Sequence, residues 1–313
     1  MKVDPRHLKL VLAIIEHGTF NRAAAAIGVS QPALSKSISQ LERALGVKVF
    51  DRGKRGTELT EAGRIVARGA QNVEAAIDRA QAEIAASLNR AEGPLTIGVT
   101  PSVALGLLPR CLGDMAAAQP RTITHIVEGL DGALFPALLR GEIELLIGPI
   151  DPLRAPDHSV VELLLAQEPF LLGVPAGHRL AGSGPVDIGQ LSQEPWILPS
   201  PGSSFYRIVE ALFLATGQRL PTDAVVTNNL LMQESLIVST GRLCLLTPAQ
   251  LIGRRPRFEL LRIAHGPSRT LGIRHLAHTR LSPAAEALIA FLHLAARDVA
   301  VLAESFHTPP ILP

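Results

Sequence analysis

The sequence has few cysteines and no long apolar run, and both absences narrow the class of protein. Only Cys111 and Cys244 occur in 313 residues, far apart and each in apolar surroundings. We expect two buried thiols in a reducing compartment, with a disulfide as the weaker alternative. No run of about 18 apolar residues occurs, which argues against a membrane-spanning helix. The opening stretch MKVDPRHLKL differs from a signal peptide because it has no uninterrupted apolar segment, so we expect a cytoplasmic protein.

Catalytic and metal-binding signatures are missing as well. The ten histidines are scattered, and no H-E-x-x-H, C-x-x-C, G-x-S-x-G or P-loop pattern occurs. The stretch PGSSF at residues 201–205 is typical of a helix cap rather than of a nucleophile elbow. The sequence therefore predicts a protein without enzymatic activity, metal site or cofactor.

Proline is almost absent from the first third of the chain. Only Pro5 and Pro32 precede residue 93, whereas the other 22 of the 24 prolines follow it. The first part is thus compatible with helix nearly throughout, and the second part is rich in turns. A chain of this length with 47% hydrophobic and 19% charged residues is typical of two or three globular domains. We place the main boundary at EGPL, residues 92–95.

Positive charge is concentrated at the N-terminal end. Residues 1–60 contain ten Lys and Arg against five Asp and Glu, a net charge of +5, whereas the whole chain carries +2. The remaining residues therefore carry a net charge of −3. A small basic segment attached to a mildly acidic body indicates that the segment alone binds a polyanion.

Three short helices and a wing are predicted before residue 60. The first helix carries an apolar stripe within residues 8–15, the second covers FNRAAAAIG at 20–28, and the third lies between Ser30 and Gly46. The buried stripe of the third helix is expected to consist of Leu34, Ile38, Leu41 and Leu45. The glycine turn between the second and third helices predicts a helix-turn-helix. Two β-like segments, 47–50 and 57–60, flank the basic loop DRGKRG and predict a wing.

A long helical stretch without proline follows at residues 61–91. Its apolar residues are spaced alternately by four and by three, as in a coiled-coil seam. The seam consists of Val66, Ala70, Val73, Ile77, Ala80 and Ile84. Because the stretch lies between two domains, we expect a dimerisation helix. The alternative is a helix that packs on its own domain.

Strand-like and helix-like segments alternate beyond residue 93. The predicted strands are 95–100, 122–129, 143–150, 169–175, 223–228, 243–248 and 270–279. The predicted helices are 102–118, 132–142, 204–217, 230–241 and 282–306. This order favours two α/β lobes with parallel strands, in which the chain crosses to the second lobe and then returns. We expect a ligand-binding cleft between the lobes.

The stretch FNRAAAAIGVSQPALSKSISQLERALGVKVFDRGKRGTELTEAG carries a highly specific pattern. Together with the preceding helix, it closely resembles the DNA-binding domain of LysR-type transcriptional regulators over residues 8–63. The later phrases LTIGVT, LLRGEIELLIG and EPWILPSPGSSFYR resemble the effector half of the same family. Within the family they are similar to the subgroup typified by the galactose-binding protein regulator.

The resemblance implies an α/β protein with three parts. These are a winged helix-turn-helix at residues 1–60, a linker and dimerisation helix at 61–92, and an effector-binding domain like a periplasmic binding protein at 93–313. Lobe I would comprise about 93–165 and 267–304, and lobe II about 166–266. Family members are usually homotetramers built as pairs of dimers. The implied partners are double-stranded DNA and a small-molecule effector (a sugar, sugar acid or aromatic acid), with RNA polymerase as a further candidate and no membrane.

The third helix is expected to enter the major groove with its N-terminal residues on base edges. Its outward positions are Gln31, Pro32, Ser35, Lys36 and Ser39. Gln31 suits adenine, Lys36 suits either a guanine or a phosphate, and Ser35 suits either purine. Many members of the family have arginine at the position of Lys36, so bidentate reading of guanine is weaker here.

Three basic residues of the wing, Arg52, Lys54 and Arg55, are expected to contact phosphate or the minor groove. The glycines on either side of the loop, Gly53 and Gly56, allow it to lie close to the DNA. A solvated charge cluster is the alternative for all three, and an ion pair within the domain is a further alternative for Arg52.

Hydroxyl groups near the predicted strand ends and helix starts are candidates for effector binding, because free N–H groups and hydroxyls there bind anions or polyhydroxy compounds. The candidates are Thr100, Ser102, Ser203, Ser204, Phe205, Thr227 and Thr247, with Phe205 as an apolar wall. The alternative is that the hydroxyls belong to ordinary N-caps and turn residues. Where family members often carry Ser or Thr after the glycine that Gly129 matches, this chain has Leu130 and Asp131. That departure favours a hydroxyl-rich or cationic effector group over a simple carboxylate.

The leading hypothesis is thus a ligand-responsive transcription factor. The alternative is a two-lobed small-molecule binding protein whose N-terminal helices serve only for assembly. Such a protein would normally be exported, and no signal peptide is recognisable. An enzyme on an α/β scaffold is a more distant alternative, because a fold does not determine a function.

Overall fold

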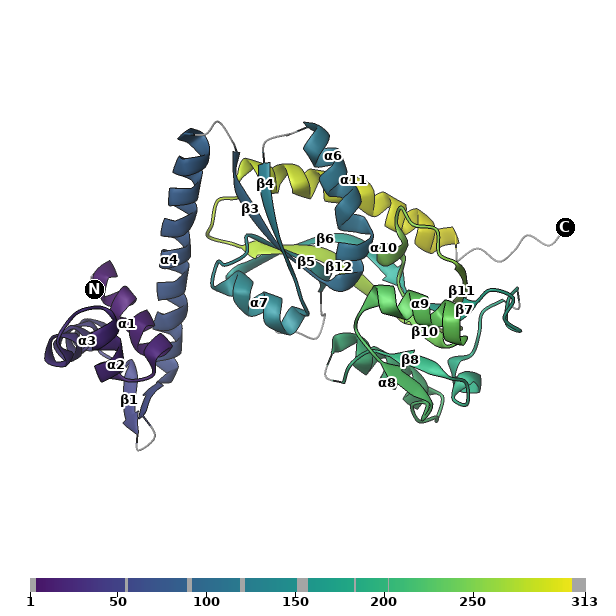
Figure 1. Ribbon diagram of the computed structural model, residues 1–313, viewed down its shortest axis with the longest axis horizontal. Helices are drawn as coiled ribbons and strands as arrows, with labels where there is room; N and C mark the ends of the chain where they lie inside the picture. Colours follow the sequence, from purple (N-terminus) through teal and green to yellow (C-terminus); the bar gives the residue numbers. More distant parts are fainter. Residues whose placement is uncertain are drawn as a thin grey trace. The chain divides into compact units, whose positions relative to one another are not determined.

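The computed structural model describes residues 4–53, 56–88, 92–118, 122–150, 157–182, 184–201 and 203–305 (Figure 1). The chain divides into two compact units. One comprises Met1–Asn89 with Pro136–Glu142, and the other comprises Arg90–Phe135 with Ile143–Pro313. None of the described helices is long and apolar enough to cross a membrane.

The N-terminal unit begins with three short helices at the predicted positions, α1 Pro5–His17, α2 Phe20–Ala26 and α3 Gln31–Leu45. The side chain of a polar residue caps the start of each helix; these residues are Asp4, Thr19 and Ser30. Glycines with left-handed backbone, Gly18 and Gly46, end α1 and α3. The predicted stripe of α3 is confirmed, because Leu34, Ile38 and Leu41 are buried in the core of this unit and Leu45 packs against it.

The wing is an antiparallel pair, β1 Phe50–Gly53 and β2 Gly56–Leu59. The first strand begins later than predicted, because Lys48 and Val49 bond to Glu42 of α3. Val49 is fully buried, and its N–H donates to Oε1 of Glu42 at 2.9 Å. Phe50 N–H donates to the same oxygen at 3.3 Å, and Lys48 Nζ donates to Oε2 at 2.7 Å. The Glu42 carboxylate therefore fixes the start of the wing to α3.

The long helix α4 Glu61–Leu88 starts directly after the wing. Thr60 Oγ1 accepts a hydrogen bond from Gly63 N–H at 2.8 Å and donates to Lys48 O at 2.7 Å. A Cβ at Gly63 would lie 2.1 Å from Val49 O, so only glycine allows α4 to approach the chain this closely. The stretch LTEAG, residues 59–63, thus sets the angle at which α4 leaves the wing.

The predicted seam of α4 divides into two parts. Ala70 is 1% exposed and Val66 packs against the core of the N-terminal unit, so this end of the helix follows the alternative of packing on its own domain. Farther along, Val73, Ile77 and Ile84 are exposed by 39%, 41% and 62%. The second part of the seam is therefore apolar surface that a further helix would cover.

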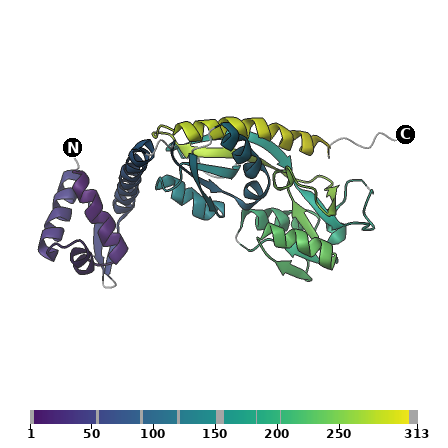
Figure 2. The same ribbon diagram turned by 45° about the horizontal axis from the view of Figure 1, so that its top comes forward.

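The second unit contains a first sheet with the strand order β4-β3-β5-β12-β6. Its strands are β3 Glu92–Val99, β4 Thr122–Glu128, β5 Leu145–Ile150, β6 Val160–Pro169 and β12 Ser268–Leu276. The pairs β3–β4 and β3–β5 are parallel, whereas β12 is antiparallel to β5 and β6. The helices of this lobe are α5 Pro101–Leu105, α6 Leu107–Ala118, the first part of α7 Asp131–Leu139, as far as Phe135, and α11 Pro283–Ser305. Helix α11 lies against α6 and β6 (Figures 1 and 2).

A second sheet of the same unit has the strand order β11-β7-β10-β8-β9. Its strands are β7 Leu171–Pro175, β8 Trp196–Leu198, β9 Ala224–Val226, β10 Leu243–Leu246 and β11 Phe258–Arg262. The helical segments are η1 Ile188–Leu191, α8 Ser204–Ala215, α9 Leu230–Thr240 and α10 Pro248–Leu251. We call the first sheet with its helices lobe I and the second lobe II. Each lobe has its own apolar core.

The observed lobes differ from the prediction in several elements. Strands β6, β8 and β11 were not predicted, and the predicted helix at 102–118 is broken at Gly106 into α5 and α6. A Cβ at Gly106 would lie 2.3 Å from Ala249 O, so the glycine at the break lets α10 approach closely. Strand β6 pairs with β12 as far as Pro169, past residue 165, the predicted end of the first segment of lobe I.

The chain crosses between the lobes at two adjacent points. Pro169 ends β6 and Leu171 begins β7, while residues 263–267 lead back from β11 to β12. Phe170 N–H donates to Pro267 O at 3.2 Å and joins the two crossings. This is the hinge region of the two-lobed unit.

Candidate DNA-binding and effector sites

The outer face of α3 carries the side chains predicted to contact DNA. Pro32, Lys36 and Ser39 are exposed, whereas Gln31 and Ser35 are half-buried. The opposite face of the helix is buried in the core, so α3 is held firmly with this row of side chains pointing away from the core. In the wing, Arg52 lies in β1, whereas Lys54 and Arg55 lie outside the described residues.

Two of the predicted effector residues meet at an arginine that the sequence had not indicated. Arg269, near the start of β12, donates from Nη2 to Ser102 Oγ at 2.8 Å and to Thr247 Oγ1 at 2.9 Å. Ser102 belongs to α5 in lobe I, and Thr247 directly follows β10 of lobe II and caps α10, which packs against α5. The guanidinium therefore holds both lobes through their hydroxyl groups.

The charge of Arg269 is neutralised by Glu168, at the end of β6. Nε and Nη2 of Arg269 lie 2.7 and 2.6 Å from Oε1 of Glu168, which is fully buried. The second carboxylate oxygen accepts a hydrogen bond from Ala249 N–H, in the first turn of α10, at 2.7 Å. A buried ion pair needs such additional hydrogen bonds to offset its desolvation. We call Glu168, Arg269, Ser102 and Thr247 the interlobe junction.

Thr100 lies beside this junction and is 6% exposed. It is the N-cap residue of α5, but its hydroxyl makes no capping hydrogen bond. Among the described residues, its buried Oγ1 has no hydrogen-bond partner. A Cβ at Gly148 would lie 2.6 Å from Thr100 Cγ2, so this glycine provides the room for the threonine. A buried hydroxyl without a partner is unfavourable and suits a position that a ligand completes.

The predicted residues of lobe II have structural roles in this state. Ser203 caps α8 by accepting from Tyr206 N–H at 3.0 Å, and Thr227 Oγ1 accepts from Asn229 N–H at 3.1 Å. Phe205 stacks on Phe170 with ring centroids 5.1 Å apart. Ser204 is the first residue of α8. Ser203 is therefore a helix cap and Thr227 a turn residue before α9, and Phe205 forms a wall next to the hinge.

Asp131, which had favoured a cationic effector group, already has a partner. It forms an ion pair with Arg274 of β12, which is fully buried. Arg274 also donates to Pro149 O at 3.2 Å and lies 5.5 Å from the ring centroid of Phe135. Because lobe I neutralises this carboxylate internally, Asp131 is a poor candidate for a cation-binding residue.

Residues 5–64 match the family described as bacterial regulatory helix-turn-helix proteins of the LysR family, and residues 89–297 match the LysR substrate binding domain. The chain belongs to the LysR family of transcriptional regulators. The predicted fold class, the function as a DNA-binding regulator and the absence of enzymatic function are thereby confirmed. The alternative of a binding protein without a DNA role does not account for the match at residues 5–64.

Similar proteins include several regulators of this family. The uncharacterized HTH-type transcriptional regulator YdcI of Escherichia coli K12 is 30% identical over 76% of each chain. A probable hydrogen peroxide-inducible genes activator of Streptomyces viridosporus is 38% identical over 56% of this chain and 55% of its own. A full-length OxyR variant from Pseudomonas aeruginosa, with one cysteine replaced by aspartate, matches with a TM-score of 0.61 and 25% identity, covering 95% of each chain.

Both thiols of this LysR-family regulator are buried. Cys111 is 0% and Cys244 2% exposed, and they belong to the cores of different lobes. Burial raises the pKa of Cys111 to about 11, and burial also raises the pKa of Cys244. Since the thiolate is the reactive form, neither cysteine is prepared for reaction at neutral pH.

Proposed function

We propose that this regulator binds operator DNA through the outer face of α3 and through its wing. Gln31, Pro32, Ser35, Lys36 and Ser39 would face the major groove, and Arg52, Lys54 and Arg55 the backbone or minor groove. The observation that supports this assignment is the division of α3 into a buried face and an outward polar face. Base edges in the major groove match amide, hydroxyl and ammonium groups.

Fluorescence anisotropy with DNA from upstream of its own gene tests this proposal. Gln31→Ala and Lys36→Ala should each weaken specific binding by about 1–3 kcal/mol. Arg280→Ala is the control, because Arg280 is exposed in lobe I and its replacement also removes one positive charge. If the α3 variants bind as tightly as the Arg280 variant, the assigned face is wrong.

Lys36 has two candidate contacts that salt dependence separates. A guanine contact predicts that Lys36→Ala loses discrimination between operator and unrelated DNA. A phosphate contact predicts uniformly weaker binding to both DNAs and a slope of log K against log salt that is smaller by about one.

We further propose that α4 forms the dimer and that two dimers form a tetramer. The exposed Val73 and Ile77 continue into a small apolar groove of about 190 Å³ beside α1, which Leu8 and Leu12 also line. The groove and the exposed seam fit a helix of a second copy. Replacing Val73 and Ile77 by glutamate should shift the mass measured by light scattering to a smaller species.

We also propose that the protein acts in the cytoplasm, where its DNA is.

We propose that the effector acts at the interlobe junction. An effector with hydroxyl or carboxylate groups would compete with Ser102 and Thr247 for Arg269, and Thr100 would supply a further hydroxyl. In this state Arg269 connects the lobes. Exchange of its hydrogen-bond partners for an effector would therefore change the position of one lobe relative to the other. Sugars, sugar acids and aromatic acids are the proposed classes, and the similarity to the galactose-binding protein regulator subgroup supports the sugars first.

A thermal-shift screen with galactose, galacturonate and benzoate tests the effector site, since a ligand that binds the native state raises its melting temperature. Thr100→Val keeps the shape of the side chain and should abolish the shift. Ser203→Ala is the control, because the hydroxyl of Ser203 serves as a helix cap. A shift that Thr100→Val leaves unchanged would place the effector elsewhere.

The name of the Streptomyces relative raises the possibility of peroxide sensing, which the buried thiols do not support. Both cysteines lie in apolar cores, and burial raises the pKa of each. We therefore propose a regulator that responds to a bound small molecule and not to thiol oxidation.

A further inference from the structure

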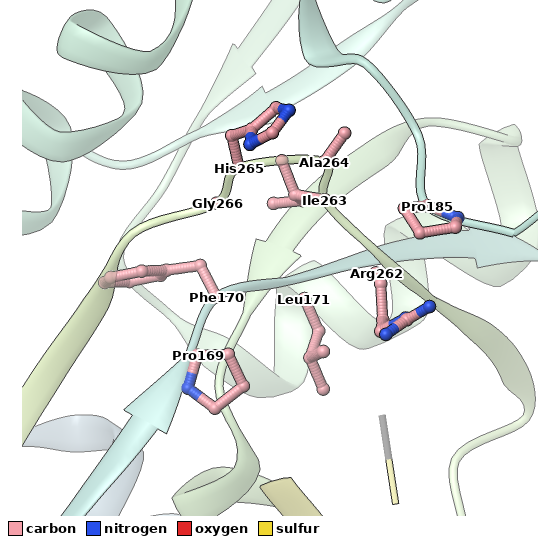
Figure 3. Close-up of a pocket in the computed structure, with 9 residues that line it drawn as sticks. All are labelled: Pro169, Phe170, Leu171, Pro185, Arg262, Ile263, Ala264, His265 and Gly266. Carbon is pink, nitrogen blue, oxygen red and sulfur yellow. The ribbon is translucent and has the colours of Figure 1, made fainter. Parts of the chain in front are cut away.

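A pocket of about 260 Å³ lies at the hinge, where both crossings meet (Figure 3). Residues 169–171 form one side, and residues 262–266 with Pro185 form the other. None of the residues predicted to bind the effector is among its described lining residues. We call this the hinge pocket.

The hinge pocket has an apolar interior and positively charged or ionisable groups beside it. Phe170 and Leu171 are each 1% exposed and Ile263 8%, so their side chains are packed behind the cavity, and the half-buried Pro169 and Ala264 contribute its apolar surface. The described lining includes Arg262 and His265 but no acidic residue. Figure 3 shows the two side chains leaving the segment 262–266 in different directions. Such a surface suits a ligand with an apolar body and one negative charge.

The wall of the pocket is fixed by its own backbone hydrogen bonds. Ala264 N–H donates to Val186 O at 2.8 Å, and Val186 N–H donates to Arg262 O at 2.8 Å. Gly266 N–H donates to Ile263 O at 3.1 Å, and the turn places His265 in the left-handed region with φ 52°. A non-glycine residue in this region is uncommon and is maintained here by the surrounding bonds. The cavity is therefore part of the folded hinge.

Phe170 connects the hinge pocket with the interlobe junction. Its ring lies 5.8 Å from the guanidinium carbon of Arg269 and stacks on Phe205. The segment 169–171, which lines the pocket, is therefore in contact with Arg269 through the buried ring of Phe170. Because both crossings line the pocket, a ligand bound there would also change the angle between the lobes.

We propose that the hinge pocket is a second ligand site, which binds a small carboxylate with a compact apolar body and modulates the hinge. The cavity is smaller than the roughly 300–1,000 Å³ typical of sites for drug-sized ligands, so the body is about the size of one aliphatic ring. The site is separate from the effector site proposed above and does not depend on it.

Isothermal titration of the full-length protein with cyclohexanecarboxylate tests the proposal, with cyclohexanecarboxamide as the neutral counterpart. We expect one carboxylate bound per chain and about tenfold weaker binding of the amide, since the charged group makes the stronger hydrogen bonds. Ala264→Phe, which fills the cavity, should abolish binding. Arg262→Gln should reduce the preference for the carboxylate, whereas the control Arg257→Gln, on the same lobe, should retain it.

The junction variant Thr100→Val separates the two sites. Binding of cyclohexanecarboxylate that survives Thr100→Val and is lost in a folded Ala264→Phe variant supports the hinge pocket. Failure to bind at about 10 mM, a concentration at which even weak sites fill, overturns the proposal. So does binding that Thr100→Val abolishes or that Ala264→Phe leaves intact, and binding of acid and amide with equal affinity overturns the assigned charge. Circular dichroism confirms that each variant is folded.

Discussion

Arg269 and Glu168 form a buried ion pair in which Nε and Nη2 of the guanidinium lie 2.7 and 2.6 Å from one carboxylate oxygen. The remaining bonds of the pair reach α5 through Ser102 and α10 through Thr247 and Ala249. The pair thus joins β6 and β12, the strands next to the crossings, to α5 and to the end of β10, where α10 begins. Its removal tests how much of the two-lobed state depends on one charge interaction.

Arg269→Met should destabilise the protein by about 3–5 kcal/mol, because it leaves the fully buried Glu168 without a counter-charge. Glu168→Leu should have a similar effect, and the double variant should lose less than the sum of the two. Urea unfolding followed by circular dichroism measures these free energies. The control is Arg110→Met, whose ion pair with Asp298 is about half exposed and should contribute less than about 1 kcal/mol. Additive losses in the double variant would contradict a direct pair.

Gly63→Ala should destabilise the wing and the start of α4. The added Cβ would lie 2.1 Å from Val49 O, and relief requires a backbone shift that costs about 1–3 kcal/mol. Gly69→Ala is the matched control in the same helix, because a Cβ there meets nothing within 4 Å. It should stabilise the helix by up to about 1 kcal/mol. Differential scanning calorimetry of both variants checks the opposite signs, and equal effects would refute the close contact.

The N-terminal unit was largely predictable because its signals are local. Caps such as Ser30, glycines such as Gly46 and the apolar stripe of α3 each lie within one helix and its ends. The division of α4 was not predictable, since a regular seam does not show where the helix leaves its own domain. Burial of Ala70 and exposure of Ile77 depend on the position of α1.

The fold class of the effector unit was predictable from the sequence, but the contacts of its interlobe junction were not. Ser102 begins a predicted helix and Thr247 lies at the end of a predicted strand, which made both hydroxyls visible as candidates. Their partner Arg269 reaches them only because β12 pairs with β6, which carries Glu168, 101 residues earlier in the chain. Such antiparallel pairing between distant segments leaves no local periodicity, and for the same reason β6 and β11 were missed.

Acid should weaken the attachment of the wing through Glu42. Burial raises the pKa of this carboxyl, but hydrogen bonds from Lys48, Val49 and Phe50 outweigh the burial and leave the pKa below its ordinary value of 4.5. A group with a lowered native pKa contributes stability above its unfolded pKa and loses it as the pH falls through the native pKa. Melting temperatures should therefore fall below pH 4.5 more steeply for the parent than for Glu42→Gln. Glu16→Gln, exposed on α1, is the control and should follow the parent curve.

The two thiols should be unreactive in the folded protein. Cys111 and Cys244 are buried, and burial raises the pKa of both, that of Cys111 to about 11, so little thiolate exists at neutral pH. Ellman's reagent should modify neither in the native state and both after unfolding, and hydrogen peroxide should leave the affinity for operator DNA unchanged. Ser239→Cys, which places a thiol on the exposed face of α9, provides the positive control for reactivity. Rapid modification of one native thiol, or loss of DNA binding with peroxide in the parent but not in a Cys111→Ala variant, would show instead that the lobe core opens and that oxidation regulates the protein.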